Sequence, residues 1–183
     1  RLALWGAGAL LADDMGLGKT LQAIALLLSR AHKGPQLIVV PTSVVMNWRD
    51  EIARFAPSLS VKILNTPGDD RNTIICKAKT FDIVIITYGL LSIEETLLTS
   101  RTWNTIVLDE AHTIKNRETK MSQSAMKLKA DFRLMLTGTP LQNHVSEMWN
   151  LMQFANPDLL GSFEDFTNRF LLPIERDHDK ESQ

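Results

Sequence analysis

Four short runs of this sequence are apolar at nearly every position and rich in β-branched residues. They are residues 37–40 (LIVV), 82–87 (DIVIIT), 105–110 (TIVLDE) and 132–139 (FRLMLTGT). A strand with one solvated face alternates apolar and polar side chains, whereas a strand buried on both faces does not. The runs therefore predict strands of a parallel sheet that is covered by helices on both faces. Residues 8–13 and 60–64 predict a fifth and a sixth strand.

Helical patterns separate these runs. Residues 19–34 carry apolar side chains at helical spacing and end in basic residues that precede a Gly-Pro boundary. Residues 43–57 predict a second helix that starts with Ser43 as its N-cap and ends before a proline. Alternating strands and helices imply right-handed crossovers between parallel strands. We therefore predict an α/β fold with a doubly wound, mainly parallel sheet and helices on both of its faces.

Composition narrows the class of protein. The 183 residues suit one domain, and a formal net charge of -1 means that any anionic partner must be held by a local patch. No apolar run approaches the ~20 residues of a membrane helix, and no leader sequence is visible, so we expect no membrane partner. The single cysteine, Cys76, argues against an internal disulfide and fits a cytoplasmic location, which would be the nucleoid if the protein is bacterial. The histidines are scattered along the sequence, which argues against a structural zinc site. The chain begins at Arg1 and not at Met, which suggests a piece of a longer protein.

The phosphate loop, which we define as residues 11–20 (LADDMGLGKT), follows the first predicted strand and leads into a helix that starts near Lys19. Backbone N–H groups at a helix N-terminus attract anions, and glycines let the backbone curl around phosphate oxygens. The predicted nucleotide-binding residues are Asp14, Met15, Gly16, Leu17, Gly18, Lys19 and Thr20. Lys19 is expected to reach the β and γ phosphates, and the Thr20 hydroxyl to bind Mg²⁺. The pattern G-x-x-x-x-G-K-[ST] has glycine where this chain has Asp13, so a simple helix-capping turn is the alternative.

The DEAH turn, which we define as residues 109–112, supplies acidic groups at the end of a buried strand. Asp109 is expected to hold Mg²⁺ directly or through water, and Glu110 to orient and deprotonate the attacking water. Lys19, Asp109 and Glu110 are thus the candidate catalytic residues, and Thr20 and Asp109 the candidate metal ligands. Taken alone, the tetrapeptide could also be an acidic helix cap. Behind a phosphate loop, a site for ATP and Mg²⁺ is the better interpretation.

Six stretches together resemble, in order, the N-terminal motor lobe of SWI/SNF-type ATPases in helicase superfamily two. They are LLADDMGLGKTLQAIAL, LIVVPTSVVMNWRDE, DIVIITYGLL, LDEAHTIKN, LMLTGTPLQN and EMWNLMQFANPDLLGSFEDF. The resemblance spans residues 10 to about 172 and implies a single RecA-like lobe of the P-loop NTPase class. It accounts for Asp13, because acidic residues precede the phosphate loop in this family. The resemblance implies that residues 1–172 form the helicase-like ATP-binding lobe. Residues 173–183 would be a charged tail that leads to a second lobe, which is absent here. The sequence of residues 159–177 is most similar to bacterial members of the family.

The resemblance also implies roles in DNA contact or in coupling DNA to the nucleotide. The residues concerned are Pro41, Thr42, Ser43, Thr87, Tyr88, Thr137, Gly138 and Thr139. Short hydroxyls and backbone N–H groups can grip phosphates without reading bases. Six of these residues have simpler alternatives: a strand exit and helix cap for Pro41 and Thr42, a packing residue for Tyr88, and a glycine turn for the last three. Trp48 lies at helical spacing with apolar neighbours and is expected in the core.

The family resemblance implies a DNA-dependent ATPase that uses ATP and Mg²⁺ to translocate on double-stranded DNA and to remodel or displace bound proteins. In this family a second RecA-like lobe supplies arginines to the γ-phosphate, and such arginines are worth ~10³ to 10⁵ in rate. The fragment alone should therefore hydrolyse ATP poorly. Two alternatives remain from the sequence: a strand-separating helicase or restriction-type motor lobe, and a non-catalytic docking module with the same fold.

Overall fold

A computed structural model describes residues 6–13, 16–64, 70–138 and 145–173. Its main sheet has six strands in the order β1-β8-β6-β2-β4-β3, and every neighbouring pair is parallel. The strands are β1 (Ala9–Leu11), β2 (Gln36–Val40), β3 (Ser60–Ile63), β4 (Asp82–Thr87), β6 (Thr105–Leu108) and β8 (Arg133–Leu136). All six coincide with predicted strands, and the predicted parallel sheet is confirmed. A second sheet pairs β5 (Thr102–Trp103) with β7 (Lys129–Ala130), which the sequence pattern did not predict.

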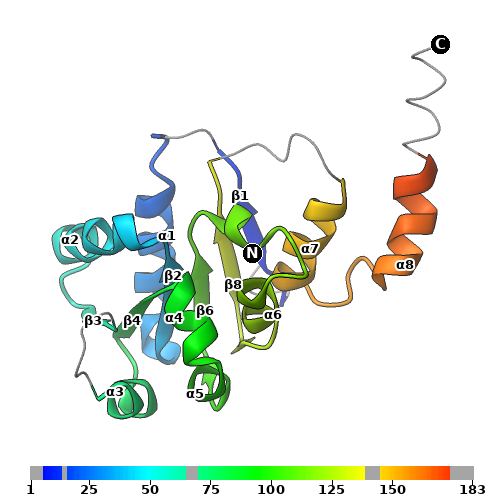
Figure 1. Cartoon of the computed structure of the whole chain (residues 1–183). Coiled ribbons are helices and arrows are strands. Elements are labelled where there is room, and N and C mark those ends of the chain that lie inside the picture. Colours follow the sequence, from blue (N-terminus) through cyan, green and yellow to red (C-terminus); the bar gives the residue numbers. More distant parts are fainter. Residues whose placement is uncertain (1–5, 14–15, 65–69, 139–144, 174–183) are drawn as a thin grey trace.

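Helices cover both faces of the main sheet (Figure 1). One face carries α1 (Lys19–Arg30) and α2 (Val45–Phe55). The other carries α3 (Arg71–Lys77), α4 (Tyr88–Ile93), α5 (Glu95–Thr99), α6 (Lys120–Met126) and α7 (Val145–Ala155). The chain then reaches α8 (Phe163–Phe166) and a π-helical turn, Thr167–Leu171, which lie outside the layered part. None of the described helices is long and apolar enough to cross a membrane.

Strand β2 shows why its sequence does not alternate. Leu37 and Val39 pack on the side of α3 to α7, while Ile38 and Val40 pack on the side of α1 and α2, and all four are fully buried. A fully buried side chain of this kind stabilises the fold by roughly 1.5–3 kcal/mol. Because both faces of β2 pack in the core, a polar residue in place of any of these four would lose the stabilisation that burial provides, whichever face it is on.

The start of α2 differs from the prediction. The chain leaves β2 through a 3-10 turn, Thr42–Val44, and the backbone N–H of Val44 donates to the carbonyl oxygen of Pro41 at 3.2 Å. Val44, with no side-chain cap, then occupies the N-cap position of α2. The predicted Ser43 cap is wrong, because the 3-10 turn places Ser43 before the N-cap, inside the turn.

Candidate nucleotide-binding site

The phosphate loop connects the end of β1 to the start of α1. Gly16 has φ 86° and Gly18 has φ 76°, the left-handed region that other residues adopt at a cost. Gly18 is the N-cap of α1, and its carbonyl accepts the first helical hydrogen bond from the N–H of Gln22 at 3.0 Å. The first-turn N–H groups of a helix lack intrahelical partners and carry the positive end of the helix dipole. The loop therefore has the backbone shape that an anion site needs.

Lys19 crosses the phosphate loop. Its Nζ donates to the carbonyl oxygen of Asp13 at 2.6 Å. The side chain thus lies along the loop in this structure, and a phosphate that binds there would compete for the same amine. Asp14 and Met15, two of the predicted nucleotide-binding residues, lie outside the described residues.

The DEAH turn begins one residue after β6. Asp109 still continues the strand, since its N–H donates to the carbonyl oxygen of Val39 at 2.9 Å. Glu110 then takes φ 49° and ψ 53°, a left-handed conformation that costs a non-glycine residue on the order of 1–2 kcal/mol. This sharp reversal lets adjacent residues leave the strand in different directions. The ring of His112 follows, with Nδ1 3.3 Å from a carboxylate oxygen of Glu110.

Asp109 is held by hydrogen bonds from three parts of the chain. The indole Nε1 of Trp48 donates to Oδ2 at 2.7 Å, and the N–H of Glu110 donates to Oδ1 at 2.9 Å. The hydroxyl of Tyr88 donates to the main-chain oxygen of Asp109 at 2.7 Å. Burial raises the pKa of Asp109, and the hydrogen bond from Trp48 works against that rise. Burial raises the pKa of Tyr88 well above its ordinary value, with the charges of Asp109 and Glu110 adding to it, so this hydroxyl stays a donor.

A hollow of about 340 Å³ joins the phosphate loop to the DEAH turn, and we call it the nucleotide hollow. Its lining residues are Gly16, Gly18, Lys19, Thr20, Leu21, Val44, Glu51, Asp109 and Glu110. The groups that the sequence analysis assigned to phosphate, metal and water thus meet in one place, although β1 and β6 are separated in the sheet by β8. Mg²⁺ in nucleotide sites takes one or two protein oxygens together with phosphate oxygens and water. The hydroxyl of Thr20 and the carboxylate of Asp109 fit that donor set, and the described residues contain no cluster of three or more His, Cys, Asp or Glu that could hold a metal by themselves.

The residues predicted to contact or couple to DNA fall into two groups. Thr42 and Ser43 are exposed at the carboxyl end of β2. Tyr88 and Thr137 are buried, at 4% and 1% exposure, so their side chains have no surface for DNA, and only coupling is compatible with this structure. Thr87 caps α4 through its Oγ1, which accepts from the N–H of Leu90 at 3.3 Å.

Two further residues of that prediction lie at the ends of β2 and β8. Pro41 is half-buried and precedes the 3-10 turn, and Gly138 is half-buried just after Thr137. Thr139 lies outside the described residues. The N–H of Thr137 donates to the carbonyl oxygen of Leu11 at 3.0 Å, so the segment after β8 is tied to the start of the phosphate loop.

Sequence reasoning missed the polar role of Trp48 and the presence of Glu51 in the nucleotide hollow. Trp48 was expected in the core and is buried there, at 1% exposure, but its N–H also reaches Asp109. A buried tryptophan N–H usually has a hydrogen-bond partner, and α2 follows β2, the neighbour of β6. That combination was the available signal. Glu51 had no such signal, because its place depends on the exact rotation of α2.

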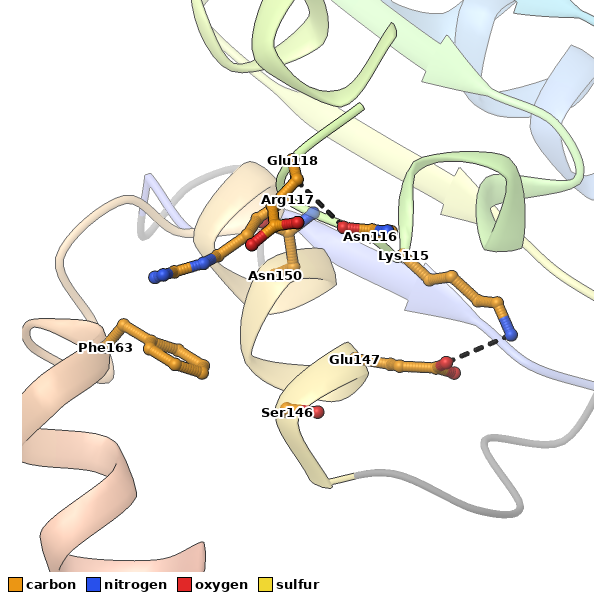
Figure 2. Close-up of a pocket in the computed structure, with 8 residues that line it drawn as sticks. All are labelled: Lys115, Asn116, Arg117, Glu118, Ser146, Glu147, Asn150 and Phe163. Atoms are coloured by element: carbon orange, nitrogen blue, oxygen red, sulfur yellow. Dashed lines mark hydrogen bonds and ion pairs between the residues drawn. The ribbon is translucent and has the colours of Figure 1, made fainter. Parts of the chain in front are cut away.

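A second contact region connects the segment after the DEAH turn to α7 and α8 (Figure 2). Lys115 and Glu147 point toward one another, with 3.0 Å between Nζ and Oε1. The buried side chain of Asn150 donates to the carbonyl oxygen of Ile114 and to the hydroxyl of Ser122. The guanidinium of Arg117 lies 4.2 Å from the ring centre of Phe163, the first residue of α8. Helix α7 is therefore fixed to the segment that carries the DEAH turn.

Comparison with known proteins agrees with this geometry. A model of the SNF2-related domain matches residues 4–183. The chain belongs to the SNF2-related family. YwqA of Bacillus subtilis, named as an ATP-dependent helicase/translocase, is 46% identical to this SNF2-related chain in an alignment that covers 96% of this chain and 20% of that protein. The ISWI chromatin-remodeling complex ATPase CHR11 of Arabidopsis thaliana is 40% identical in an alignment that covers 94% of this chain and 17% of that protein.

A solved structure supports the same family. The Sulfolobus solfataricus SWI2/SNF2 ATPase core in complex with dsDNA superposes with a TM-score of 0.84 and 42% identity, over 96% of this chain and 37% of that one. The predicted RecA-like lobe of an SWI/SNF-type ATPase is thereby confirmed as the fold and family of this chain. The SNF2-related chain spans about a fifth of YwqA and a smaller share of CHR11.

Proposed function

We propose that this chain is the ATP-binding lobe of a DNA-dependent ATPase that translocates on double-stranded DNA and so remodels or displaces proteins bound there. The observation that carries the proposal is the nucleotide hollow, in which the phosphate loop meets Asp109 and Glu110. Membership of the SNF2-related family supports it, since relatives are named as ATP-dependent helicases, translocases and remodelling ATPases.

In this proposal, different residues of the hollow bind the phosphates, the metal and the attacking water. The N–H groups of the first turn of α1 and the amine of Lys19 bind the phosphates. Thr20 and Asp109 would hold Mg²⁺, which neutralises phosphate charge and aligns the triphosphate. The carboxylate of Glu110 orients a water and accepts its proton while the water oxygen attacks the terminal phosphorus and ADP leaves. His112, beside Glu110, limits where that carboxylate can turn.

The proposed partners are double-stranded DNA and a second RecA-like lobe of the same protein. Thr42 and Ser43 would contact DNA phosphates, and their exposure at the end of β2 supports this role. The dsDNA complex of the Sulfolobus core supports a DNA track for a lobe of this fold. Closure of two lobes around ATP would convert binding into relative movement, and arginines of the second lobe would supply ~10³ to 10⁵ in rate, so the lobe alone hydrolyses ATP poorly. The proposed location is the cytoplasm, at the nucleoid in a bacterium.

The test uses a polypeptide in which this chain is joined to a second motor lobe. We expect ATPase activity that DNA stimulates, and loss of that activity in Lys19→Ala and in Glu110→Gln. Glu164→Gln, which changes an exposed carboxylate of α8, is the matched control and keeps full activity. Full activity in Lys19→Ala or Glu110→Gln contradicts the proposal.

Strand separation is the second candidate, because the name of YwqA covers both helicase and translocase. An unwinding assay with the same polypeptide separates the two. Product strands identify a helicase, whereas DNA-stimulated ATPase without product strands identifies a duplex translocase. If the chain binds no Mg²⁺ and nucleotide at millimolar concentration, the result would favour the remaining alternative, a non-catalytic docking module with the same fold.

A further inference from the structure

Trp48 connects helix α2 to the carboxylate that would hold Mg²⁺. Its ring lies in the core between α2 and the sheet, at 1% exposure, and its N–H donates to Oδ2 of Asp109 at 2.7 Å. The two residues come from neighbouring parts of the fold, since α2 follows β2 and Asp109 follows β6, and these strands pair. A hydrogen bond to an ionised group is among the stronger ones in proteins, so it fixes the carboxylate as well as satisfying the indole.

The hydrogen bonds on Asp109 leave room for a metal. Oδ2 accepts from Trp48 and Oδ1 accepts from the N–H of Glu110. An ionised carboxylate offers about four lone-pair sites on its two oxygens. Each oxygen therefore has lone-pair capacity beyond these two hydrogen bonds, and the two donors, one on each oxygen, fix the orientation of the group. Such a carboxylate is oriented before a metal arrives.

Helix α2 forms a wall of the nucleotide hollow. Val44, at its N-cap, and Glu51 both line the hollow. Positions 44, 48 and 51 recur at about one helical turn and so share a face. The turn that contains Thr42 and Ser43 leads directly into this helix, so Trp48 is held by an element that also borders the hollow.

We propose that Trp48 is a positioning residue, which orients Asp109 for Mg²⁺ through its indole N–H. This rests on the proposed function, because it needs Mg²⁺ and nucleotide to bind in the hollow. Packing alone would require only the ring of Trp48, whereas positioning requires the N–H. The two roles therefore separate in a variant that keeps an aromatic ring and lacks the donor.

The chain offers a matched control for that variant. Trp103 is also fully buried, and its Nε1 donates to the carbonyl oxygen of Leu98 at 3.1 Å, away from the nucleotide hollow. Trp48→Phe and Trp103→Phe each remove one buried indole N–H and similar volume. We expect Trp48→Phe to weaken Mg²⁺ binding to the chain with a non-hydrolysable ATP analogue by about 10- to 100-fold, the usual effect of losing a partner that orients a metal ligand. Trp103→Phe leaves that affinity unchanged, and neither variant changes binding of the analogue without Mg²⁺.

A second measurement uses the unaltered chain and does not depend on whether Trp48→Phe folds. The indole N–H resonances of the chain are followed by ¹⁵N NMR as Mg²⁺ is added to the analogue complex. Coordination withdraws electron density from the carboxylate and weakens the hydrogen bond, so the Trp48 indole proton moves upfield while that of Trp103 stays in place.

The outcomes separate this inference from the proposed function. If the unaltered chain binds no Mg²⁺ with nucleotide, both are wrong. If it binds them, but the Trp48 resonance does not move on Mg²⁺ addition, or Trp48→Phe binds Mg²⁺ as tightly as Trp103→Phe, only the positioning role is wrong. A Trp48 shift together with the selective loss in Trp48→Phe supports it.

Discussion

The phosphate loop and the DEAH turn both face the nucleotide hollow, but different physical means hold them. The phosphate loop relies on backbone conformation: Gly16 and Gly18 adopt left-handed dihedral angles, and open space surrounds both. The DEAH turn relies on side chains, since Trp48 and Tyr88 reach it from α2 and α4. Changes in the loop should therefore act through backbone strain, whereas changes at the turn should act through hydrogen bonds and charge.

The largest expected effect is at the DEAH turn. Asp109→Asn removes the charge that would hold Mg²⁺, and metal stabilisation of phosphoryl transfer is worth several kcal/mol. In the two-lobed polypeptide we expect DNA-stimulated ATPase to fall by about a hundredfold or more. Asp50→Asn, on the exposed side of α2, is the control and should keep its rate. Equal ATPase rates in the two variants would show that Asp109 has no role in ATP hydrolysis.

A change in the phosphate loop should act on stability. Gly18→Ala meets no neighbouring atoms but places a side chain at φ 76°, which costs about 1–2 kcal/mol. Gly89→Ala is the control, because Gly89 lies in α4 with open space and no positive φ, and there alanine should stabilise by about 0.5–1 kcal/mol. Urea unfolding of both variants gives the comparison. If Gly18→Ala and Gly89→Ala change the free energy of unfolding in the same direction, backbone strain at Gly18 is not what distinguishes the loop.

Tyr88→Phe tests the side-chain support of the DEAH turn. It removes the hydroxyl that donates to the main-chain oxygen of Asp109 and should lower the free energy of unfolding by about 1 kcal/mol. No change in unfolding would show that the turn keeps its shape without Tyr88.

Alkaline pH gives a further check, because Tyr88 is the single tyrosine of the chain. Its pKa is raised in the folded protein, so the stability it contributes is present below the ordinary value of 10.0 and is lost as pH rises above that value. Absorbance at 295 nm should show no tyrosinate near pH 10 until the chain unfolds. The alkaline loss of stability should shrink in Tyr88→Phe. Formation of tyrosinate in the folded chain at pH 10 would contradict the raised pKa of the buried Tyr88 hydroxyl.

The smallest effect is expected beyond the DEAH turn. Lys115 and Glu147 form an ion pair whose lysine side chain is about half exposed. Such pairs contribute about 0–1 kcal/mol. Lys115→Met should therefore shift thermal unfolding less than Tyr88→Phe does, and the difference between them should persist at high salt. A larger loss in Lys115→Met would mean that the contact with α7, and not the buried hydrogen bonds, holds this segment.

Much of the fold was predictable from the sequence, because the strands at the middle of the main sheet, β2, β4 and β6, are mostly apolar and are buried along nearly all their length. The two-residue strands β5 and β7 were not, since two residues show no periodicity. The meeting of Lys19 with Asp109 and Glu110 followed from the rule that polar residues after parallel strands share one sheet edge. That rule places residues by strand ends, so it needs no knowledge of side-chain rotamers.

Details of the site depended on tertiary structure. The hydrogen bond from Trp48 to Asp109 joins residues on separate elements, and its existence depends on how α2 rotates over the sheet. The prediction of a Ser43 cap failed because a 3-10 turn precedes the helix and moves the N-cap to Val44. Family resemblance assigned Tyr88 and Thr137 to DNA contact or coupling, and the sequence did not show that both side chains are buried, which leaves them only the coupling role.

The position of β1 has a consequence for how the protein is made. This strand carries the phosphate loop, lies at the edge of the sheet, and pairs with β8, the last strand among the described residues (Figure 1). During synthesis the loop leaves the ribosome before β8, its neighbour in the sheet, and the other strands of the main sheet are translated between the two. A nascent chain should therefore acquire the ability to retain a triphosphate only after β8 has emerged, however early its loop was translated.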